Sequence, residues 1–177
     1  MLSADALAYV KSKIRDIPDF PSPGIIFKDI TPLLADPRAF HIVLDSLAER
    51  FIGAHVDAVV GVEARGFIFG GALAARLNAS FVPARKPGKL PAVVDKVAYA
   101  TEYSTAELEM HKDSLRPGTR AIIVDDVLAT GGTAKAAASL VVGQGGEVVA
   151  YAFVIELEFL KGRTVLQPTR IESVLGY

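Results

Sequence analysis

Two stretches near the start of the chain carry hydrophobic residues at helical spacing. Residues 2–14 place apolar side chains three or four positions apart, which is typical of one buried helix face. A second stripe begins after Asp36 and Pro37, a pair that favours a helix start because aspartate caps free amides and proline tolerates the first helical position. The prolines between residues 17 and 24 exclude a helix from the segment that joins the two stretches.

From residue 57 onward, short apolar runs alternate with helical stretches. The runs predict buried strands at residues 57–62, 80–84, 120–124 and 148–155. Helices are expected at 66–77 and 133–142. Strands that alternate with helices are typical of a parallel sheet covered on both faces. We therefore predict an α/β fold, with a single domain over residues 1–177 and a parallel, twisted sheet flanked by helices.

One stretch, residues 86–113, interrupts this alternation. It is rich in charges, prolines and glycine, and it contains two partial alternations of apolar and polar residues at 92–99 and 106–110. Alternation with a period of two predicts half-buried strands, so we expect a hairpin outside the main sheet. Long excursions of this kind often act as flexible lids over a site. A plain surface hairpin is the alternative interpretation.

The composition narrows the possible classes of function. The 177 residues are 51% hydrophobic, which supplies one packed core, and the net charge of -1 gives no reason to expect a nucleic-acid or membrane surface. The absence of cysteine excludes disulfides and thiolate chemistry, and it fits the reducing cytoplasm. The longest apolar run, 148–155, is far shorter than the ~20 residues of a membrane span. The first fifteen residues lack the pattern of a secretory signal.

The most informative segment runs from residue 121 to residue 133. An apolar strand ends in Asp125 and Asp126, a loop of small residues follows, and a helix then begins. In parallel sheets, ligands bind at the carboxyl ends of the strands. Glycines let backbone amides approach a ligand closely, and the helix start adds its positive dipole end, so the loop favours a phosphate dianion. The predicted phosphate-binding residues are Ala129, Thr130, Gly131, Gly132 and Thr133.

The two aspartates beside this loop are poor phosphate ligands but good acceptors for hydroxyl groups. A sugar phosphate suits both features, with its ribose hydroxyls on Asp125 and Asp126 and its 5′-phosphate in the loop. The alternative is that the acids merely cap a turn, which the ordered succession of strand, acid pair, loop and helix disfavours. The glycine-lysine string of a P-loop and the G-x-G-x-x-G pattern are both missing after the predicted strands.

A second loop with the same layout follows the strand at 57–62. Arg65 lies where the strand end meets the next helix, and an arginine there offers paired donors to a phosphate. Arg85, Lys86 and Lys89 form a dense basic cluster that we interpret as further pyrophosphate ligands. A turn-capping arginine and solvated surface charges are the alternatives.

The segment of about residues 20–32 combines rigid prolines with apolar residues. Phe27 could stack on a planar base, and backbone groups near Ile26 could contact the edge of that base. Stacking on an aromatic ring contributes ~1–3 kcal/mol per base. By composition alone, Phe27 as an ordinary core residue is the favoured interpretation.

These motifs together resemble the type I phosphoribosyltransferase family. Its signature is the strand, acid pair and loop described above, and the resemblance implies ribose hydroxyls on Asp125 and Asp126 and a pyrophosphate on the Arg65 loop. In that family the pyrophosphate loop often contains a cis peptide, which would be Glu63-Ala64 here. The resemblance also implies a homodimer, in which the basic cluster could reach the neighbouring subunit's site.

The resemblance extends along most of the chain to the adenine-specific members of this family. It is carried by residues 20–32, 62–70, 86–91 and 102–109, and by Glu156-Leu157 before Leu160-Lys161-Gly162-Arg163. It implies that Phe27 and Leu157 sandwich the adenine, that Ile26 contacts its edge, and that Lys28 lies close by. Some relatives have arginine in place of Lys28 and aspartate-serine in place of Glu63-Ala64.

The implied reaction joins adenine to the ribose of phosphoribosyl pyrophosphate and yields AMP and pyrophosphate, a step of purine salvage. Mg²⁺ would be held mainly by substrate and water oxygens, with no dedicated protein cage. Glu102 resembles the family's acid/base residue, and Tyr103 would lie over the reacting centre.

Three alternatives to this function remain at the level of the sequence. A transferase for a 6-oxopurine and a non-catalytic ribose-phosphate regulator share the expected fold. A signalling receiver domain also carries an acid pair at a strand end, but it carries that pair on its first strand.

Overall fold

The chain is built from two compact units. The computed structural model describes residues 2–100 and 105–177. The first unit ends at Ser46, and the second unit is Leu47–Tyr177. The second unit contains the parallel sheet and the predicted phosphate loop.

The first unit begins with α1 (Ala4–Lys11), which is shorter than the helix predicted over residues 2–14. Ser3 sets its start, because the Ser3 side chain accepts a hydrogen bond of 3.2 Å from the Ala6 amide. After α1, the prolines do exclude a helix as predicted, and the chain forms the antiparallel pair β1 (Arg15–Pro18) and β2 (Ile26–Asp29). The short helix α2 (Thr31–Leu34) follows.

The helix α3 (Pro37–Glu49) starts at the predicted aspartate-proline pair. Asp36 Oδ1 accepts a hydrogen bond of 3.0 Å from the Ala39 amide, which is the expected capping contact. Its Oδ2 also accepts from the Tyr9 hydroxyl at 2.8 Å and pairs with Lys13 at 2.8 Å. These bonds tie α1 to the start of α3 within the first unit.

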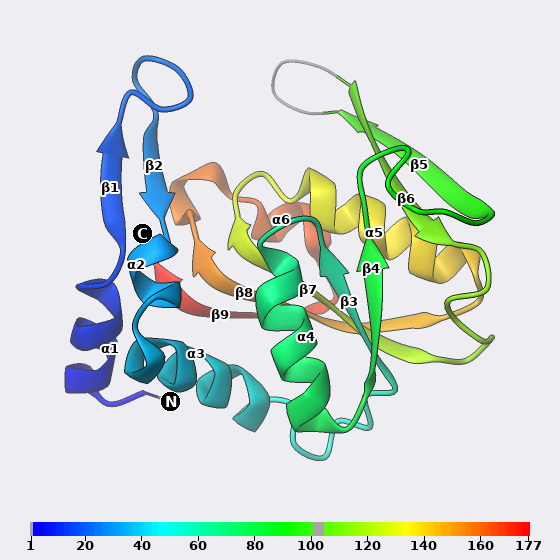
Figure 1. The fold of residues 1–177 in the computed structure, drawn as a ribbon, viewed down its shortest axis with the longest axis horizontal. Helices are drawn as coiled ribbons and strands as arrows, with labels where there is room; N and C mark the ends of the chain where they lie inside the picture. Colours follow the sequence, from blue (N-terminus) through cyan, green and yellow to red (C-terminus); the bar gives the residue numbers. More distant parts are fainter. Residues whose placement is uncertain (1, 101–104) are drawn as a thin grey trace. The chain divides into compact units, whose positions relative to one another are not determined.

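The second unit is organised around a five-stranded sheet (Figure 1). Every neighbouring pair in it is parallel, and the strand order is β4-β3-β7-β8-β9. This arrangement confirms the predicted α/β fold with a parallel sheet. The strands are β3 (Ala58–Val62), β4 (Ser80–Ala84), β7 (Arg120–Leu128), β8 (Glu147–Glu156) and β9 (Arg170–Gly176).

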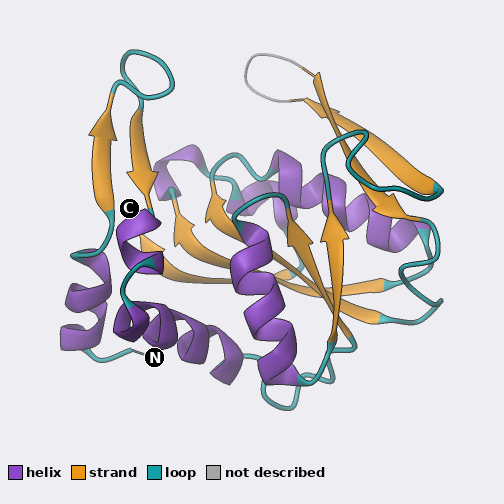
Figure 2. Ribbon diagram, in the orientation of Figure 1, coloured by secondary structure: helices purple, strands orange, loops and turns teal. Residues whose placement is uncertain are grey.

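Two long helices cover the sheet, α4 (Gly66–Leu77) and α5 (Gly132–Gly143). The chain steps from β3 to β4 toward one edge and from β7 to β8 toward the other. Because such crossovers are right-handed, α4 and α5 lie on opposite faces of the sheet (Figure 2). The order therefore reverses between β3 and β7, and ligands of open parallel sheets bind at such a point.

The excursion at 86–113 forms a separate antiparallel hairpin, as predicted. Its strands are β5 (Val94–Ala100) and β6 (Thr105–His111), and they make their own two-stranded sheet. Leu108 and Met110 of β6 are buried in the same hydrophobic cluster as Ala137 and Leu140 of α5. The hairpin is therefore anchored on the α5 side of the sheet by apolar packing.

The end of the chain carries elements that the sequence pattern did not predict. A 3₁₀ turn (Glu158–Leu160) and α6 (Arg163–Leu166) follow β8, and β9 then closes the edge of the sheet. The burial along β9 does not alternate regularly, so its sequence lacks a clear period of two. Among the described residues, no helix combines the length and the apolar character needed to cross a membrane.

Candidate functional site

The predicted phosphate loop forms a small pocket at the carboxyl end of β7. The loop leads from Leu128 into α5, and it encloses a volume of about 70 Å³ lined by residues 127–134 with Asp125 and Phe153. Gly131 precedes the helix with φ of 85°, a left-handed conformation that favours glycine. The amides at the start of α5 therefore lie at a small cavity, an arrangement that suits a bound phosphate group.

The acid pair lies beside this pocket, and Asp125 is part of its lining. Asp125 Oδ1 accepts a hydrogen bond of 2.8 Å from the Asp126 amide, and Asp126 is only 4% exposed. Burial raises the pKa of Asp125 well above its usual range, and the neighbouring charge of Asp126 raises it further. Arg65 Nε forms an ion pair of 2.5 Å with Asp126 Oδ2, which links the acid pair to the second predicted loop.

A larger pocket of about 440 Å³ adjoins the acid pair. Its lining comes from the ends of β3 and β7, the basic cluster, the hairpin and the start of α5. The predicted ribose, phosphate and pyrophosphate residues thus meet at the point where the strand order reverses. The lining residues are Val62, Glu63, Ala64, Arg65, Lys86, Tyr99, Asp125, Asp126 and Thr133.

The loop after β3 has the cis peptide that the family resemblance implied. The Glu63-Ala64 peptide bond is cis, and Arg65 directly precedes α4. A side-chain carbon on Gly66 would lie 2.6 Å from the Val124 carbonyl oxygen of β7. Glycine at this position therefore lets the loop pack directly against the strand that carries the acid pair.

The basic cluster divides between the pocket and the surrounding surface. Arg85 Nε and Nη2 each lie 3.1 Å from the carboxylate of Glu63, and Nη1 donates to the Lys89 carbonyl oxygen at 2.9 Å. The Lys86 amide also donates to Glu63 at 3.1 Å. Of the three cations, Lys86 lines the large pocket, whereas Arg85 and Lys89 are not part of its lining.

Residues 33–167 match the phosphoribosyl transferase domain, which covers most of the chain. This chain belongs to the phosphoribosyltransferase family. It is 73% identical over 164 residues to the adenine phosphoribosyltransferase of Sorangium cellulosum, covering 93% of this chain and 82% of that protein. It is 54% identical over 168 residues to the adenine phosphoribosyltransferase of Methylococcus capsulatus, covering 95% of this chain and 98% of that one.

Solved structures of the family share the fold. The adenine phosphoribosyltransferase of Rhodothermus marinus is 49% identical, with a TM-score of 0.94 over 99% of this chain and 100% of that one. The enzyme of Saccharomyces cerevisiae, solved with an imino-altritol bisphosphate and adenine, is 40% identical. Its TM-score is 0.91 over 98% of this chain and 100% of the other.

The residues predicted to bind a base lie in different units of this phosphoribosyltransferase. Ile26, Phe27 and Lys28 lie on β2 of the first unit, where Phe27 packs edge-on against Phe20 with ring centroids 5.1 Å apart. Lys28 pairs with Asp16 at 2.7 Å. Leu157 belongs to the second unit, so a sandwich of adenine between Phe27 and Leu157 stays a prediction.

The two predicted catalytic residues, Glu102 and Tyr103, lie outside the described residues. In the sequence they fall between β5 and β6, within residues 101–104, which the structure does not describe. Their roles therefore stay predictions.

Two residues of the site were given no binding or positioning role from the sequence. Tyr99 lines the large pocket, and its hydroxyl lies 3.4 Å from Thr133 Oγ1. The alternation at 92–99 could have indicated that Tyr99 ends a strand near the site. Glu63 accepts hydrogen bonds from the Arg85 side chain and from the Lys86 amide. Its position at a strand end beside Arg65 was the signal that the sequence offered.

The pocket offers few ligands for a metal ion. Within residues 2–100 and 105–177, no group of three or more histidine or acidic residues is arranged to hold one. Asp125 and Asp126 present carboxylate oxygens, which suit Mg²⁺ but are fewer than its six-coordinate shell requires. These donors do not complete a Mg²⁺ shell, so a bound ion would take most of its ligands from substrate and water.

Proposed function

We propose that this chain is an adenine phosphoribosyltransferase. It transfers the 5-phosphoribosyl group from phosphoribosyl pyrophosphate to adenine and releases AMP and pyrophosphate, a step of purine salvage. The observation that carries the proposal is the small pocket of the glycine loop beside the acid pair and Arg65, at the point where the strand order reverses. The names of the similar proteins support adenine as the acceptor.

The donor occupies the two adjoining pockets. Its 5′-phosphate accepts hydrogen bonds from the amides and hydroxyls of residues 129–133, and its ribose hydroxyls donate to Asp125 and Asp126. Arg65 and Lys86 contact the pyrophosphate in the larger pocket, with Arg85 and Lys89 as further ligands. The acid pair lies between the phosphate loop and the basic residues of the larger pocket. Because carboxylates repel phosphate groups, this arrangement supports an orientation with the ribose at the acid pair and a phosphate group on either side.

The base binds between Phe27 and Leu157, with Ile26 at its edge and Lys28 close by. This part of the proposal rests on the resemblance of residues 20–32 to adenine-specific enzymes. The Giardia lamblia enzyme solved with 9-deazaadenine is 37% identical to this chain, with a TM-score of 0.92 over 100% of this chain and 99% of that one, which supports a base site within the shared fold.

The residues of the chain act mainly by position and charge. Arg65 and Lys86 neutralise the departing pyrophosphate, while the acid pair orients the ribose for attack by the base nitrogen. Glu102 manages the proton of the purine, and Tyr103 covers the reacting centre with the hairpin, which excludes water. A Mg²⁺ ion held mainly by substrate and water oxygens would supply further positive charge to the departing pyrophosphate.

The proposal includes a homodimer in the cytoplasm. The lack of cysteine fits a reducing compartment. No role for nucleic acid or a membrane is proposed.

Calorimetric titration followed by turnover tests this function. The chain is titrated with phosphoribosyl pyrophosphate and Mg²⁺, and turnover is then measured with adenine, hypoxanthine and guanine in turn. We expect tight donor binding and release of AMP from adenine alone. Turnover with a 6-oxopurine in place of adenine would contradict the base assignment, and donor binding without turnover would indicate a regulator.

A further inference from the structure

The turn before α6, which contains Gly162, packs directly against the phosphate loop. Gly162 lies so close to the loop that a side chain there would collide with the Ala129 carbonyl oxygen, and it would lie 3.0 Å from the carbonyl carbon of Thr130. In the opposite direction, a side chain on Gly131 would lie 2.8 Å from the Gly162 carbonyl oxygen. Two backbone segments are therefore in direct contact across a pair of glycines.

The conformation of Gly162 does not itself require glycine. Its φ of -56° and ψ of -27° are ordinary helical angles that any residue adopts. Close approach to Ala129 is therefore the reason for glycine at this position. Gly131 differs, because its φ of 85° favours glycine in addition to the contact.

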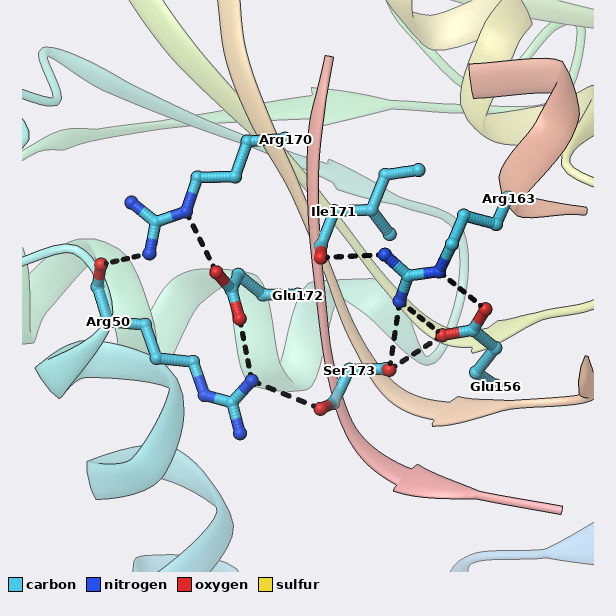
Figure 3. A network of polar contacts seen from close by, with 7 residues as sticks. All are labelled: Arg50, Glu156, Arg163, Arg170, Ile171, Glu172 and Ser173. Carbon is cyan, nitrogen blue, oxygen red and sulfur yellow. Dashed lines mark hydrogen bonds and ion pairs between the residues drawn. The ribbon is translucent and has the colours of Figure 1, made fainter. Parts of the chain in front are cut away.

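Arg163 anchors this turn to the sheet (Figure 3). Its Nε and Nη2 donate to the two carboxylate oxygens of Glu156 at 2.9 Å and 2.6 Å. Its Nη1 donates to the Ile171 carbonyl oxygen of β9 at 3.0 Å. Ser173 of β9 completes the arrangement, because its hydroxyl donates to Glu156 Oε2 at 2.7 Å. A paired guanidinium–carboxylate contact fixes the direction of both side chains.

Glu156 is placed to hold the turn rather than to contact a ligand. It is 6% exposed at the end of β8, and its hydrogen bonds from Arg163 lower its pKa, so the carboxylate is charged at neutral pH. The backbone beside it is also fixed, since the Leu157 amide donates to the Leu128 carbonyl oxygen at 2.9 Å. The strand ends of β7 and β8 are thus joined directly ahead of the phosphate loop.

We propose that Gly162 and the Glu156–Arg163 pair are positioning residues for the 5′-phosphate. The pair holds the start of α6 against β8 and β9, and the Gly162 backbone then holds residues 129–131 in the shape that the phosphate requires. This inference rests on the proposed function of the loop. A binding site must be held within about 0.5 Å of its productive geometry, so small displacements of this support weaken binding.

Replacement of two glycines by alanine tests the contact. Gly162→Ala forces the turn away from Ala129, whereas Gly143→Ala is a matched control because a side chain there meets nothing within 4 Å. The dissociation constant of ribose 5-phosphate should rise roughly 10- to 100-fold in Gly162→Ala, since displacements of about 1 Å have effects of this size. The KM for phosphoribosyl pyrophosphate should rise in parallel, while Gly143→Ala and the KM for adenine stay within about twofold.

Variants of the ion pair test the anchor. Arg163→Met removes the guanidinium, and Arg163→Lys keeps the charge without the paired contact, so we expect Arg163→Met to bind ribose 5-phosphate more weakly than Arg163→Lys does. If Arg163 acts through Gly162, the double variant Gly162→Ala/Arg163→Met should bind no more weakly than the weaker single variant. Fully additive effects would overturn the proposed coupling.

The outcomes separate this proposal from the proposed function. Equal binding of ribose 5-phosphate by Gly162→Ala and the unchanged chain overturns the positioning role alone. Equal increases in the KM values for adenine and for the donor would also overturn it, because they indicate a general structural defect. If Gly162→Ala weakens ribose 5-phosphate binding as expected but the unchanged chain does not turn over adenine, the positioning role is supported. The assignment of the base is then overturned.

Discussion

At the scale of single residues, the acid pair combines burial with an ion pair to Arg65. Asp125 and Asp126 lie next to each other near the end of β7, and Arg65 forms an ion pair with Asp126. Two adjacent carboxylates do not ionise independently, and here burial and the charge of Asp126 raise the pKa of Asp125. A ribose hydroxyl that donates to Asp125 favours its ionised form.

In the pH range where the raised pKa of Asp125 keeps it protonated in the free chain, donor binding should release a proton from the acid pair. Because the raised pKa of Asp125 falls when a hydroxyl donates to it, affinity for ribose 5-phosphate should increase as the pH rises. Calorimetry in buffers with different ionisation enthalpies measures the release, which should not exceed about one proton from this group. In Asp125→Asn the proton release from the acid pair should be lost. The proton release from the phosphate of the ligand, whose second pKa is about 6, should remain. Equal release by both proteins would contradict the role of Asp125.

Lys86 and Lys89 provide a matched pair in the basic cluster. Lys86 lines the large pocket and Lys89 does not, although only two residues separate them. A hydrogen bond to a charged group contributes about 1.5–3 kcal/mol, so Lys86→Met should raise the KM for phosphoribosyl pyrophosphate roughly 10- to 100-fold. Lys89→Met should have the smaller effect. Steady-state kinetics with the donor varied would show the difference, and the reverse order would place the pyrophosphate elsewhere.

Glu102 is the proposed proton-transfer residue of the hairpin. Glu102→Gln keeps the shape of the side chain but removes its acid/base function, so turnover with adenine should fall by about 10²–10⁴-fold. Calorimetric binding of phosphoribosyl pyrophosphate should persist, because the proposed donor ligands lie on other segments. Normal turnover by the variant would exclude the assigned role.

At the scale of elements, glycines allow the ligand loops to pack against their neighbours. The β3–α4 loop contacts β7 through Gly66, and the β7–α5 loop contacts the turn before α6 through Gly131 and Gly162. The positions of the two ligand loops are thus set by strands and turns that are distant in sequence.

Two glycines of α4 should respond to alanine in opposite ways. Gly66→Ala places a carbon 2.6 Å from the Val124 carbonyl oxygen, a clash that should cost about 1–3 kcal/mol of unfolding free energy. Gly71→Ala meets nothing within 4 Å in the middle of the same helix, so higher helix propensity should add roughly 0.5–1 kcal/mol. Denaturant unfolding measures both, and the prediction fails if Gly66→Ala unfolds at the same concentration as the unchanged chain.

At the scale of the whole molecule, the second unit brings its ligand loops together through the order of its strands. The reversal between β3 and β7 leaves the carboxyl ends of both strands open, because α4 and α5 depart to opposite faces. Core residues such as Val60 and Ile123, both fully buried and paired across β3 and β7, fix the two strands relative to each other. On β8, next to β7, Glu156 adds a buried ionic contact to this core.

The Glu156–Arg163 contact should make the stability of the folded chain depend on pH in the acidic range. The pKa of Glu156 is lowered in the folded chain, first by its hydrogen bonds from Arg163, relative to the ordinary value of 4.5. Its contribution to stability is therefore complete above pH 4.5 and is lost as the pH falls through the lower folded pKa. The thermal midpoint should fall across that window, and Glu156→Gln should flatten this dependence. An unchanged slope in the variant would assign the acid sensitivity to other carboxylates.

Much of the second unit could be predicted from the sequence because its signals are local. The helix at 66–77 and the strand at 80–84 follow from runs of apolar residues, and the structure has the same bounds. The strand at 120–124 extends further, to Leu128, because residues 125–128 continue to pair with β8. β9 was missed because its formation depends on an edge of β8 that only the folded sheet provides.

The sequence by itself determined which groups are available for the chemistry. The order of strand, acid pair, small-residue loop and helix specifies a phosphate loop, since each element depends on neighbours a few residues away. Only the tertiary structure decided that Arg65 pairs with Asp126, that Arg85 is held by Glu63, and that Gly162 supports Ala129. These contacts join segments that are 22 to 61 positions apart, and such pairings are set by the packing of the whole sheet rather than by local propensity.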